Sequence, residues 1–469
     1  MKLGKDHPKH SSVRIAALCA LLACGSPVMA QSEAAPFVPF QQFLQNVRSA
    51  NAASVTGMKT SSVQSTATFE SMRQYILDTY QNTHVGQSFV LGNDQYDCIP
   101  VLEQPSASQL GLARIASPPP PSAAPEAIAG GDSGPSPNTT AQAMAETIPV
   151  TSQLAASDKI DAYGNSRSCA AGTIPMRRIT LEEVSRFPSL KAYLQKTPDG
   201  ADRLATTQMY PSQAATQAVS KHTYAYTYQN VANLGQTTTV NLWSPYVDTA
   251  AGQIFSLAQS WTTGITDTGV NQTVEVGWQN YPAHYGDQRS RLFIYWTADS
   301  YQYTGCYNLD CAGFVQTNAN WYFGGPFPNY STPGGAQYEL RTMFQLYQGN
   351  WWLALGTPDN MTWVGYYPAT LFGNGPMHTG AQHIEFGSES VGSTTWPAEG
   401  SGNWASSGYS YAGYQRQIWY YAPDNTAQWA RLSVAQPSPS CYSIAGPYSA
   451  PTNYWGIYFY FGGPGGTSC

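Results

Sequence analysis

The sequence predicts an all-β protein, an antiparallel β-sandwich preceded by a small and mostly helical N-terminal region. Aromatic residues make up 13% of the chain and glycine is frequent, whereas charged residues make up only 11%, against about 25% in an ordinary soluble protein. From residue 222 onward, short runs of alternating polar and apolar residues are separated by Gly and Pro. Such a pattern is typical of sandwiches and barrels.

The N-terminal region, residues 31–196, contains apolar residues at helical spacing. A capping box, Thr180-Leu181-Glu182-Glu183, predicts a helix that continues through Leu194. A Pro-rich insertion occupies about residues 115–140, and residues 197–221 are polar and predict a cleavable linker. The helical repeats are Phe40, Phe43, Leu44 and Val47, and then Phe69, Met72, Ile76 and Tyr80.

The C-terminal region, residues 222–469, is predicted to form the sandwich. No long segment with a helical period interrupts its alternating runs. The predicted strands are His222–Tyr228, Thr238–Trp243, Val270–Gln279, Arg291–Thr297, Tyr338–Tyr347, Trp351–Leu355, Gln415–Tyr421 and Ile457–Phe461.

Residues 1–30 have the pattern of an export signal. Basic residues precede a short apolar run, Ile15–Cys24, and Val28-Met29-Ala30 forms a small-residue cleavage site. The run is too short to span a bilayer. We therefore expect a secreted or periplasmic protein without a membrane span, with lipoprotein anchoring at Cys24 as the less favoured alternative.

Removal of the signal leaves six cysteines, an even number that predicts a disulfide framework in an exported protein. Six cysteines allow 15 pairings. We expect Cys98 to pair with Cys169, Cys306 with Cys311, and Cys441 with Cys469, because each of these couples stays inside one predicted unit.

The charge distribution excludes a nucleic-acid binder that relies on a basic surface. Residues 222–469 contain no Lys, five Arg and twelve acidic residues. A domain with so few ion pairs loses little when carboxylates are protonated, which suits an acidic environment. His378 and His383 have no further ligands at metal-binding spacing, so we expect neither a metal nor another cofactor.

Two glutamates stand on predicted strands with the same local pattern. Glu275 and Glu385 each follow a β-branched residue and precede an apolar residue and then a glycine, Gly277 or Gly387. Alternation turns each carboxylate away from the apolar face. We expect the glycine to leave space beside the carboxylate for a substrate backbone. Two such carboxylates can serve as a general acid and a general base. Glu389 shares the face of Glu385, and we expect Glu389→Gln to retain most activity.

These motifs resemble the neprosin family. The similarity covers most of residues 222–469 in order, and upstream Cys169 with Gly172–Arg178 is similar to the family's pro-region signature. The matching segments are Glu275–Pro282, Tyr285–Asp287, Arg291–Thr297, Gly305–Gln316, Gly349–Leu353, Val364–Pro368, Leu371–Phe372 and Ile384–Gly387.

The resemblance implies a secreted glutamic endopeptidase that cleaves after proline at acid pH and is made as a zymogen. Its partners would be a proline-rich polypeptide substrate and its own pro-region as an intramolecular inhibitor. The catalytic glutamates would be Glu275 and Glu385, with the roles of acid and base unassigned. The chain departs from the family pattern at Phe386, where a Trp is usual, and at Gly387-Ser388-Glu389, where Gly-Gly-Glu is usual.

Two other functions fit the same residues. An aromatic-rich β-sandwich is also suited to binding carbohydrate without catalysis, and a pair of carboxylates also serves glycoside hydrolases.

Overall fold

The computed structural model describes residues 1, 36–56, 58–121, 124–125, 159–196, 221–451 and 454–469. Residues 35–469 form one compact unit. The predicted signal, most of the Pro-rich insertion and nearly all of the predicted linker lie outside the described residues. Within the part of the chain that is described, no helix is long and apolar enough to cross a membrane.

The N-terminal region contains the predicted helices. The helical repeats fall on α1 and α3, and the side chain of Thr180 caps α6 by accepting a hydrogen bond from the Glu183 backbone N–H. The predicted continuous helix through Leu194 is wrong, because α6 ends at Ser185 and Pro188 intervenes before a separate helix, α7. The helices are α1 (Phe40–Ser49), α2 (Ala52–Thr56), α3 (Thr66–Thr79), α4 (Pro105–Gln109), α6 (Leu181–Ser185) and α7 (Leu190–Leu194), and α8 (Pro282–Tyr285) lies in the C-terminal region.

A small antiparallel sheet, which the sequence analysis did not anticipate, accompanies these helices. It has the order β1 (Gln87–Leu91), β2 (Asp94–Pro100) and β3 (Thr173–Arg177). The disulfide between Cys98 and Cys169 joins β2 to the segment before β3, with a Cα–Cα distance of 5.4 Å.

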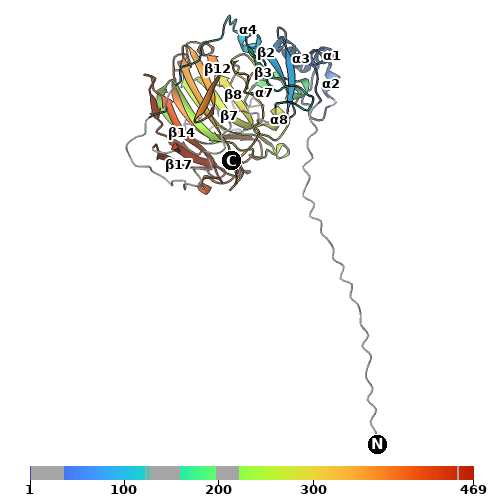
Figure 1. The fold of residues 1–469 in the computed structure, drawn as a ribbon. Coiled ribbons are helices and arrows are strands. Elements are labelled where there is room, and N and C mark those ends of the chain that lie inside the picture. The colour runs from blue at the N-terminus through green and yellow to red at the C-terminus, as the bar shows by residue number, and fades with distance from the viewer. Residues whose placement is uncertain (2–35, 57, 122–123, 126–158, 197–220, 452–453) are drawn as a thin grey trace. The chain divides into compact units, whose positions relative to one another are not determined.

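The C-terminal region is a sandwich of two antiparallel sheets, as predicted (Figure 1). The six-stranded sheet has the order β16-β4-β13-β6-β7-β8. Its strands are β4 (Lys221–Asn233), β6 (Gln253–Ile265), β7 (Asn271–Asn280), β8 (Arg291–Thr297), β13 (Ala381–Gly392) and β16 (Ser433–Ala435).

The nine-stranded sheet has the order β17-β18-β14-β5-β10-β11-β12-β9, and β15 pairs with β14. All eight predicted strands fall on observed strands of the two sheets. The strands of this sheet are β5 (Gly235–Asn241), β9 (Val315–Gln316), β10 (Glu339–Tyr347), β11 (Asn350–Thr357), β12 (Asn360–Pro368), β14 (Gly413–Tyr421), β15 (Ala427–Trp429), β17 (Ser443–Ala450) and β18 (Gly456–Gly462).

The hydrophobic core lies between the two sheets and consists mainly of aromatic and branched side chains. Polar contacts cross it as well. Trp278 of β7 donates its indole N–H to the Asn241 carbonyl of β5 at 2.9 Å, and Gln415 of β14 donates to the Gln259 carbonyl of β6 at 3.0 Å. These bonds fix how the sheets lie over one another, because buried polar groups are costly when unpaired.

The N-terminal region packs against the outer face of the six-stranded sheet. Tyr193 of α7 stacks on His284 with ring centroids 4.8 Å apart, and Phe187 contacts Tyr281 edge to face. A buried ion pair joins Asp94 of β2 to Arg291 of β8 at 2.5 Å. This face of the sheet is therefore enclosed by residues of the same chain.

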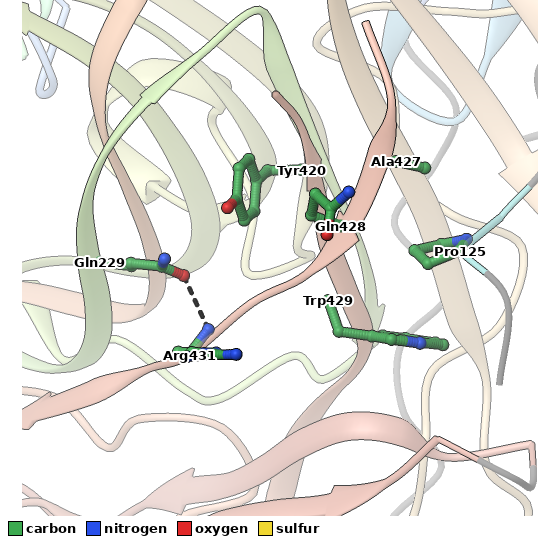
Figure 2. A pocket seen from close by; sticks show the side chains of 7 residues that line it. All are labelled: Pro125, Gln229, Tyr420, Ala427, Gln428, Trp429 and Arg431. Atoms are coloured by element: carbon green, nitrogen blue, oxygen red, sulfur yellow. Dashed lines mark hydrogen bonds between the residues drawn. The ribbon is translucent and has the colours of Figure 1, made fainter. Parts of the chain in front are cut away.

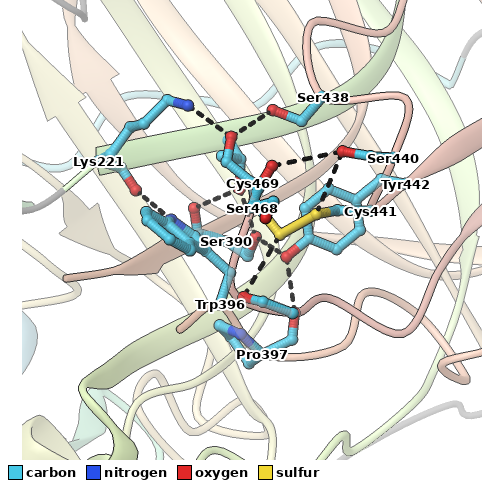
Figure 3. Close-up of a disulfide and its surroundings, with 12 residues drawn as sticks. Lys221, Ser390, Trp396, Pro397, Ser438, Ser440, Cys441, Tyr442, Ser468 and Cys469 are labelled. Carbon is cyan, nitrogen blue, oxygen red and sulfur yellow. Dashed lines mark hydrogen bonds between the residues drawn. A yellow bond between two sulfur atoms is a disulfide. The ribbon is translucent and has the colours of Figure 1, made fainter. Parts of the chain in front are cut away.

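The other two disulfides lie in the sandwich and are the pairs named from the sequence. Cys306 and Cys311 have Cα atoms 5.9 Å apart, and those of Cys441 and Cys469 are 5.7 Å apart. Figure 3 shows that the Cys469 carbonyl accepts hydrogen bonds from Ser438 and from the ammonium of Lys221, at the start of β4. This disulfide therefore holds the C-terminal segment against the first strand of the sandwich.

We expect the variant Cys441→Ser/Cys469→Ser to be less stable to chemical denaturation than the wild type. The two cysteines are 28 residues apart, and closing a loop of that length stabilises a protein by about 3–4 kcal/mol in the chain-entropy model. The variant Cys306→Ser/Cys311→Ser is the matched control and loses less, because its loop spans only five residues. Equal losses in the two variants would contradict this expectation.

Candidate active site

A buried lysine of the N-terminal region joins two glutamates of the six-stranded sheet. The Lys196 Nζ lies 2.6 Å from Glu275 Oε2 and 2.7 Å from Glu389 Oε2. All three side chains are at most 4% exposed. Each carboxylate is therefore within hydrogen-bonding distance of the same ammonium group, and neither has access to bulk water.

Glu275 lies in the middle of β7 and is held from its other side by a tyrosine. The Tyr301 hydroxyl donates to Glu275 Oε1 at 2.6 Å. Tyr301 in turn stacks on Tyr295 of β8, with ring centroids 5.8 Å apart. The Lys196 ammonium lies 5.7 Å from the ring of Trp261, which forms an aromatic surface beside the carboxylate.

A tight loop after β8 positions this tyrosine. The carboxylate of Asp299 accepts hydrogen bonds from the backbone N–H groups of Gln302, Tyr303 and Thr304. Tyr301 itself has φ 62°, in the left-handed region that a bulky residue seldom adopts. Such conformations persist only where surrounding contacts impose them, and they are concentrated at functional sites.

Glu389 lies near the end of β13 and has two further partners. His222 Nδ1 is 2.5 Å from Glu389 Oε1, and the amide of Gln259 donates to Oε2 at 3.0 Å. His222 is the second residue of β4 and Gln259 belongs to β6, so the two strands that flank β13 both contribute to holding this carboxylate.

The register of three strands explains how the two glutamates converge. On β6, Gln259 is directly opposite Gly277 of β7 on one side and Gly387 of β13 on the other. Glu275 and Glu389 lie two residues from these glycines, diagonally across Gln259. The side chain of Gln259 therefore lies between the two carboxylates on this diagonal, with a glycine on each side of it.

The prediction that these glycines leave space for a substrate backbone is wrong. A Cβ on Gly277 would lie 2.0 Å from the Ala258 carbonyl oxygen, and one on Gly387 would lie 2.4 Å from that of Ala225. The space is thus taken by the backbone of adjacent strands and not kept for a substrate. Glycine is required here for close approach of the strands.

The structure does not bring Glu385 into contact with Glu275. Both residues are paired with Trp261 of β6, Glu385 from β13 and Glu275 from β7. Their backbones are therefore two strand spacings apart, about 9.6 Å. The Glu385 carboxylate is bonded instead to His383 Nε2, and His383 Nδ1 contacts the amide oxygen of Asn230. All of these side chains share one face of the sheet, but the carboxylate that shares a cation with Glu275 is that of Glu389.

The environments of Glu275 and Glu389 move their pKa values in opposite directions. Burial, reinforced by the charge of Glu389, raises the pKa of Glu275 above its usual value despite Lys196. Burial also opposes ionisation of Glu389, but Lys196 and His222 outweigh it and lower its pKa. The two carboxylates hold the pKa of Lys196 above its usual value. Glu275 therefore takes up a proton more readily than Glu389 does.

Sequence reasoning missed most of this cluster. The available signal for Glu389 was its place on the same strand face as Glu385, two residues after Gly387. For Lys196 the signal was its position as the last residue before the predicted linker. Tyr301 and His222 carried no pattern that distinguishes them from the many other aromatic residues and histidines of the chain.

No group of three or more His, Cys, Asp or Glu side chains is arranged to hold a metal ion in the described part of the chain. Two enclosed carboxylates whose pKa values are shifted in opposite directions are suited to activating a water molecule and protonating a substrate.

Comparison with known proteins gives a family match for most of the sandwich. Residues 252–464 match the family model described as Neprosin. Among solved structures, the chain is similar to a Scytalido-glutamic peptidase with a peptide-based transition state analogue, at 11% identity, 52% coverage of this chain, 98% coverage of that chain and a TM-score of 0.27. It is also similar to SCP-B, a member of the Eqolisin family of peptidases in complex with a tripeptide, at 8% identity, 52% and 98% coverage and a TM-score of 0.23.

We expect Glu389→Gln to destabilise the full-length protein at pH 7 far more than Glu275→Gln. Glu389→Gln leaves the Lys196 ammonium with Glu275, whose pKa is raised, as its one remaining carboxyl partner, and loss of a buried ionic partner costs up to about 3–5 kcal/mol. Glu275→Gln replaces the carboxyl group that favours its protonated form with a neutral side chain of the same size, and we expect a loss below about 1 kcal/mol. Unfolding in urea measures both values. A larger loss in Glu275→Gln would show that the charges are assigned to the wrong residues.

Proposed function

We propose, from the neprosin domain at residues 252–464, that this chain is a secreted glutamic endopeptidase. It hydrolyses polypeptides after proline at acid pH and is made as a zymogen. The observation that carries the proposal is the contact of one nitrogen, Lys196 Nζ, with the carboxylates of both Glu275 and Glu389. We propose these two residues as the catalytic pair, in place of Glu275 with Glu385.

The proposed mechanism follows from the position of that nitrogen. An ammonium nitrogen and a water oxygen are similar in size and both donate hydrogen bonds to carboxylates. Once Lys196 withdraws, a water molecule at the same position contacts both carboxylates. Glu389, ionised and held by His222 and Gln259, takes a proton from this water as it attacks the scissile carbonyl carbon.

Glu275 then serves as the general acid. Burial favours its protonated form, and loss of Lys196 removes an interaction that lowers its pKa. Its proton passes to the carbonyl oxygen as water adds to the carbon. Glu389 then passes the proton that it took from water to the leaving amine as the C–N bond breaks, and the former carbonyl oxygen returns its proton to Glu275 as the C=O bond forms again. The Tyr301 hydroxyl, which donates to Glu275 Oε1, orients the acid during this transfer.

The N-terminal region acts as the inhibitor. Its last described residue, Lys196, fills the position of the attacking water, and the side chain of Gln195 anchors this end by donating to the Tyr301 and Gln302 carbonyls. Residues 181–196 thus cover the glutamates in the precursor. We propose that maturation cuts between Thr197 and Lys221 and that acid promotes release.

Replacing either member of the proposed pair should abolish hydrolysis. We expect Glu275→Gln and Glu389→Gln each to lower kcat on a proline-containing peptide by at least about a thousandfold, because glutamine cannot exchange a proton. The double variant should be little worse than either single variant, since the two residues act as a unit. Activity is measured after removal of the N-terminal region by an added protease, so that failure of self-cleavage does not confuse the result.

Glu385→Gln is the matched control, because it lies on the same strand face and is equally buried. We expect it to retain at least about a tenth of the wild-type kcat. A full loss in Glu385→Gln with activity retained in Glu389→Gln would instead support the pair Glu275 and Glu385. Release of reducing sugar from a polysaccharide, without peptide cleavage, would refute the proposed peptidase function.

Maturation should require acid because of the ion pair between Lys196 and Glu389. The pKa of Glu389 is lowered by this pairing, so the stabilisation is complete above the ordinary value of 4.5 and is lost as the pH falls through the lowered value. We expect self-cleavage, followed by gel electrophoresis, to begin only below about pH 4.5. In Lys196→Met we expect the onset pH of self-cleavage to rise by at least about one unit. The reason is that the ion pair with Glu389, which acid has to break in the wild type, is absent from this variant.

Lys191→Met is the control for this measurement. Lys191 lies on α7 and its ammonium is 4.6 Å from the ring centre of Tyr303, outside the glutamate pair. Its onset should match the wild type. An unchanged onset pH of self-cleavage in Lys196→Met would show that acid activation does not depend on this ion pair.

A further inference from the structure

The loop that follows β13 carries a glutamate, Glu399, that the proposed mechanism does not use. Its side chain is fully buried, although a glutamate is rarely buried without an ionic partner. Its backbone N–H donates to the Gly463 carbonyl at 3.0 Å, which joins the loop to the end of β18. We call residues 393–403 the Glu399 loop.

The residues just before Glu399 attach this loop to two further parts of the sandwich. Ser256 of β6 donates to the Ala398 carbonyl at 2.7 Å, and the Tyr442 hydroxyl donates to the Pro397 carbonyl at 2.7 Å. Figure 3 shows the contact of Tyr442 with Pro397 beside the C-terminal disulfide. The loop therefore connects both sheets with the C-terminal segment.

The hydrogen bond of the Glu399 carboxyl group indicates that this group is protonated. Ser388 Oγ on β13 lies 2.5 Å from Glu399 Oε2 and 3.2 Å from the Ala225 carbonyl oxygen. A hydroxyl group has only one hydrogen, so Ser388 cannot donate fully to both oxygens. Both contacts are satisfied when Glu399 donates a proton to Ser388 Oγ and Ser388 donates to Ala225.

The second carboxyl oxygen supports the same assignment. Glu399 Oε1 is buried and has no hydrogen-bond partner among the described residues. An ionised carboxylate accepts hydrogen bonds at both oxygens, and a buried charge without such partners is costly. Ser390, the next residue on this face of β13, donates to Tyr442 at 2.7 Å. The surroundings of Glu399 therefore favour the neutral acid.

No cation of the described residues forms an ion pair with Glu399. Arg431 lines a different pocket, where its backbone N–H donates to Gln229 Oε1 at 2.7 Å (Figure 2). Gln229 is four residues from Ala225 on β4, about 13 Å along the strand. The other arginines of residues 222–469 are engaged elsewhere: Arg289 and Arg291 pair with Asp287, Arg416 pairs with Glu339, and Arg341 lies 6.0 Å from the ring of Trp419.

The titratable groups around the Glu399 loop do not compensate a charge on Glu399. The Lys221 ammonium is bonded to the C-terminal carbonyl group, and His222 is bonded to Glu389 on the opposite face of the sheet. Burial raises the pKa of Glu399 well above its usual value, and the charge of Glu389 raises it further. Burial also raises the pKa of Tyr442, so its hydroxyl stays neutral.

We propose that Glu399 is a pH-sensitive anchor, which holds the Glu399 loop in place while its carboxyl group is protonated and releases the loop as the pH rises. Ionisation removes the proton that Glu399 donates to Ser388, the residue directly before Glu389. It therefore loosens the end of β13 and the C-terminal segment bonded to Pro397. The proposal does not depend on the proposed peptidase function.

The sign of the effect follows from the raised pKa. In the unfolded chain Glu399 ionises near its ordinary value of 4.5, whereas the folded protein retains the proton to higher pH. The stabilisation is therefore complete below that value. Above it, the folding equilibrium constant falls by up to about tenfold per pH unit until the pH reaches the raised pKa. This dependence is opposite to that of Glu389, whose ion pair is lost in acid.

Glu399→Gln tests the anchor, because glutamine has the same size and donates to Ser388 as the neutral acid does, but it cannot ionise. Unfolding in urea is measured for the full chain between about pH 5 and about pH 8. We expect the folding constant of the variant, divided by that of the wild type, to increase at least about a hundredfold over this range. Glu70→Gln, at an exposed position of α3, is the control and should give a constant ratio. A constant ratio for Glu399→Gln would overturn the proposal.

Reduction of disulfides by a phosphine locates the opening. In the folded wild type, we expect reduction of Cys441–Cys469, relative to that of Cys306–Cys311, to accelerate at least about tenfold between about pH 5 and about pH 8. In Glu399→Gln this ratio should not change with pH. An equal acceleration of both disulfides, or of neither, would contradict release of the Glu399 loop.

A third measurement leaves Glu399 unchanged and remains informative if Glu399→Gln does not fold. The full chain with Glu275→Gln is labelled with carbon-13 at the glutamate side-chain carboxyl groups, and its NMR spectrum is recorded at about pH 7. This background removes the other glutamate whose pKa is raised. We expect one carboxyl signal at the position of a protonated acid. If all glutamate signals are those of ionised carboxylates, Glu399 is not the proposed anchor.

Discussion

One buried ammonium between two buried carboxylates is the contact on which the organisation of this chain depends. Bringing Lys196, Glu275 and Glu389 out of water is costly, and it is tolerable only because each group finds partners in the others. The same contact requires the N-terminal region to end over the six-stranded sheet. It also requires the loop at Tyr301 and the strands around Gln259 to keep their present positions.

The scarcity of lysine in the sandwich gives this contact its specificity. Residues 222–469 contain no lysine, so the cation opposite the two glutamates comes from outside that segment. A cation supplied by a separable segment can be withdrawn, whereas one built into the sheet would neutralise the pair permanently. His222 and Gln259 stay bonded to Glu389 when Lys196 is absent. They favour the ionised form of Glu389, whereas burial favours the protonated form of Glu275.

Much of the fold was predictable from sequence because sheet alternation and helical spacing are local signals. All eight predicted strands were found, and Arg291–Thr297 was predicted with its observed bounds. The break between α6 and α7 was missed although Pro188 signals it, and the small sheet β1–β3 was missed because its strands are short and far apart in sequence. The position of Glu275, and the face of β13 that carries both Glu385 and Glu389, followed from alternation. The choice between Glu385 and Glu389 depends on the register of β6, β7 and β13, which no local pattern encodes.

The N-terminal region contacts both faces of the sandwich, and this arrangement affects how it can leave. A cut within residues 197–221 removes its covalent link to β4 but leaves the contact at Lys196 on one sheet and the contact of residues 110–116 on the other. Two linked contacts hold a ligand much more tightly than either alone, because the second forms at a high effective concentration. Acid weakens the first contact through Glu389 but has no titratable group to act on in the apolar packing of Leu112 and Ile115. Acid therefore weakens only one of the two contacts, and the N-terminal region stays in contact with the sandwich through the other until that packing is broken.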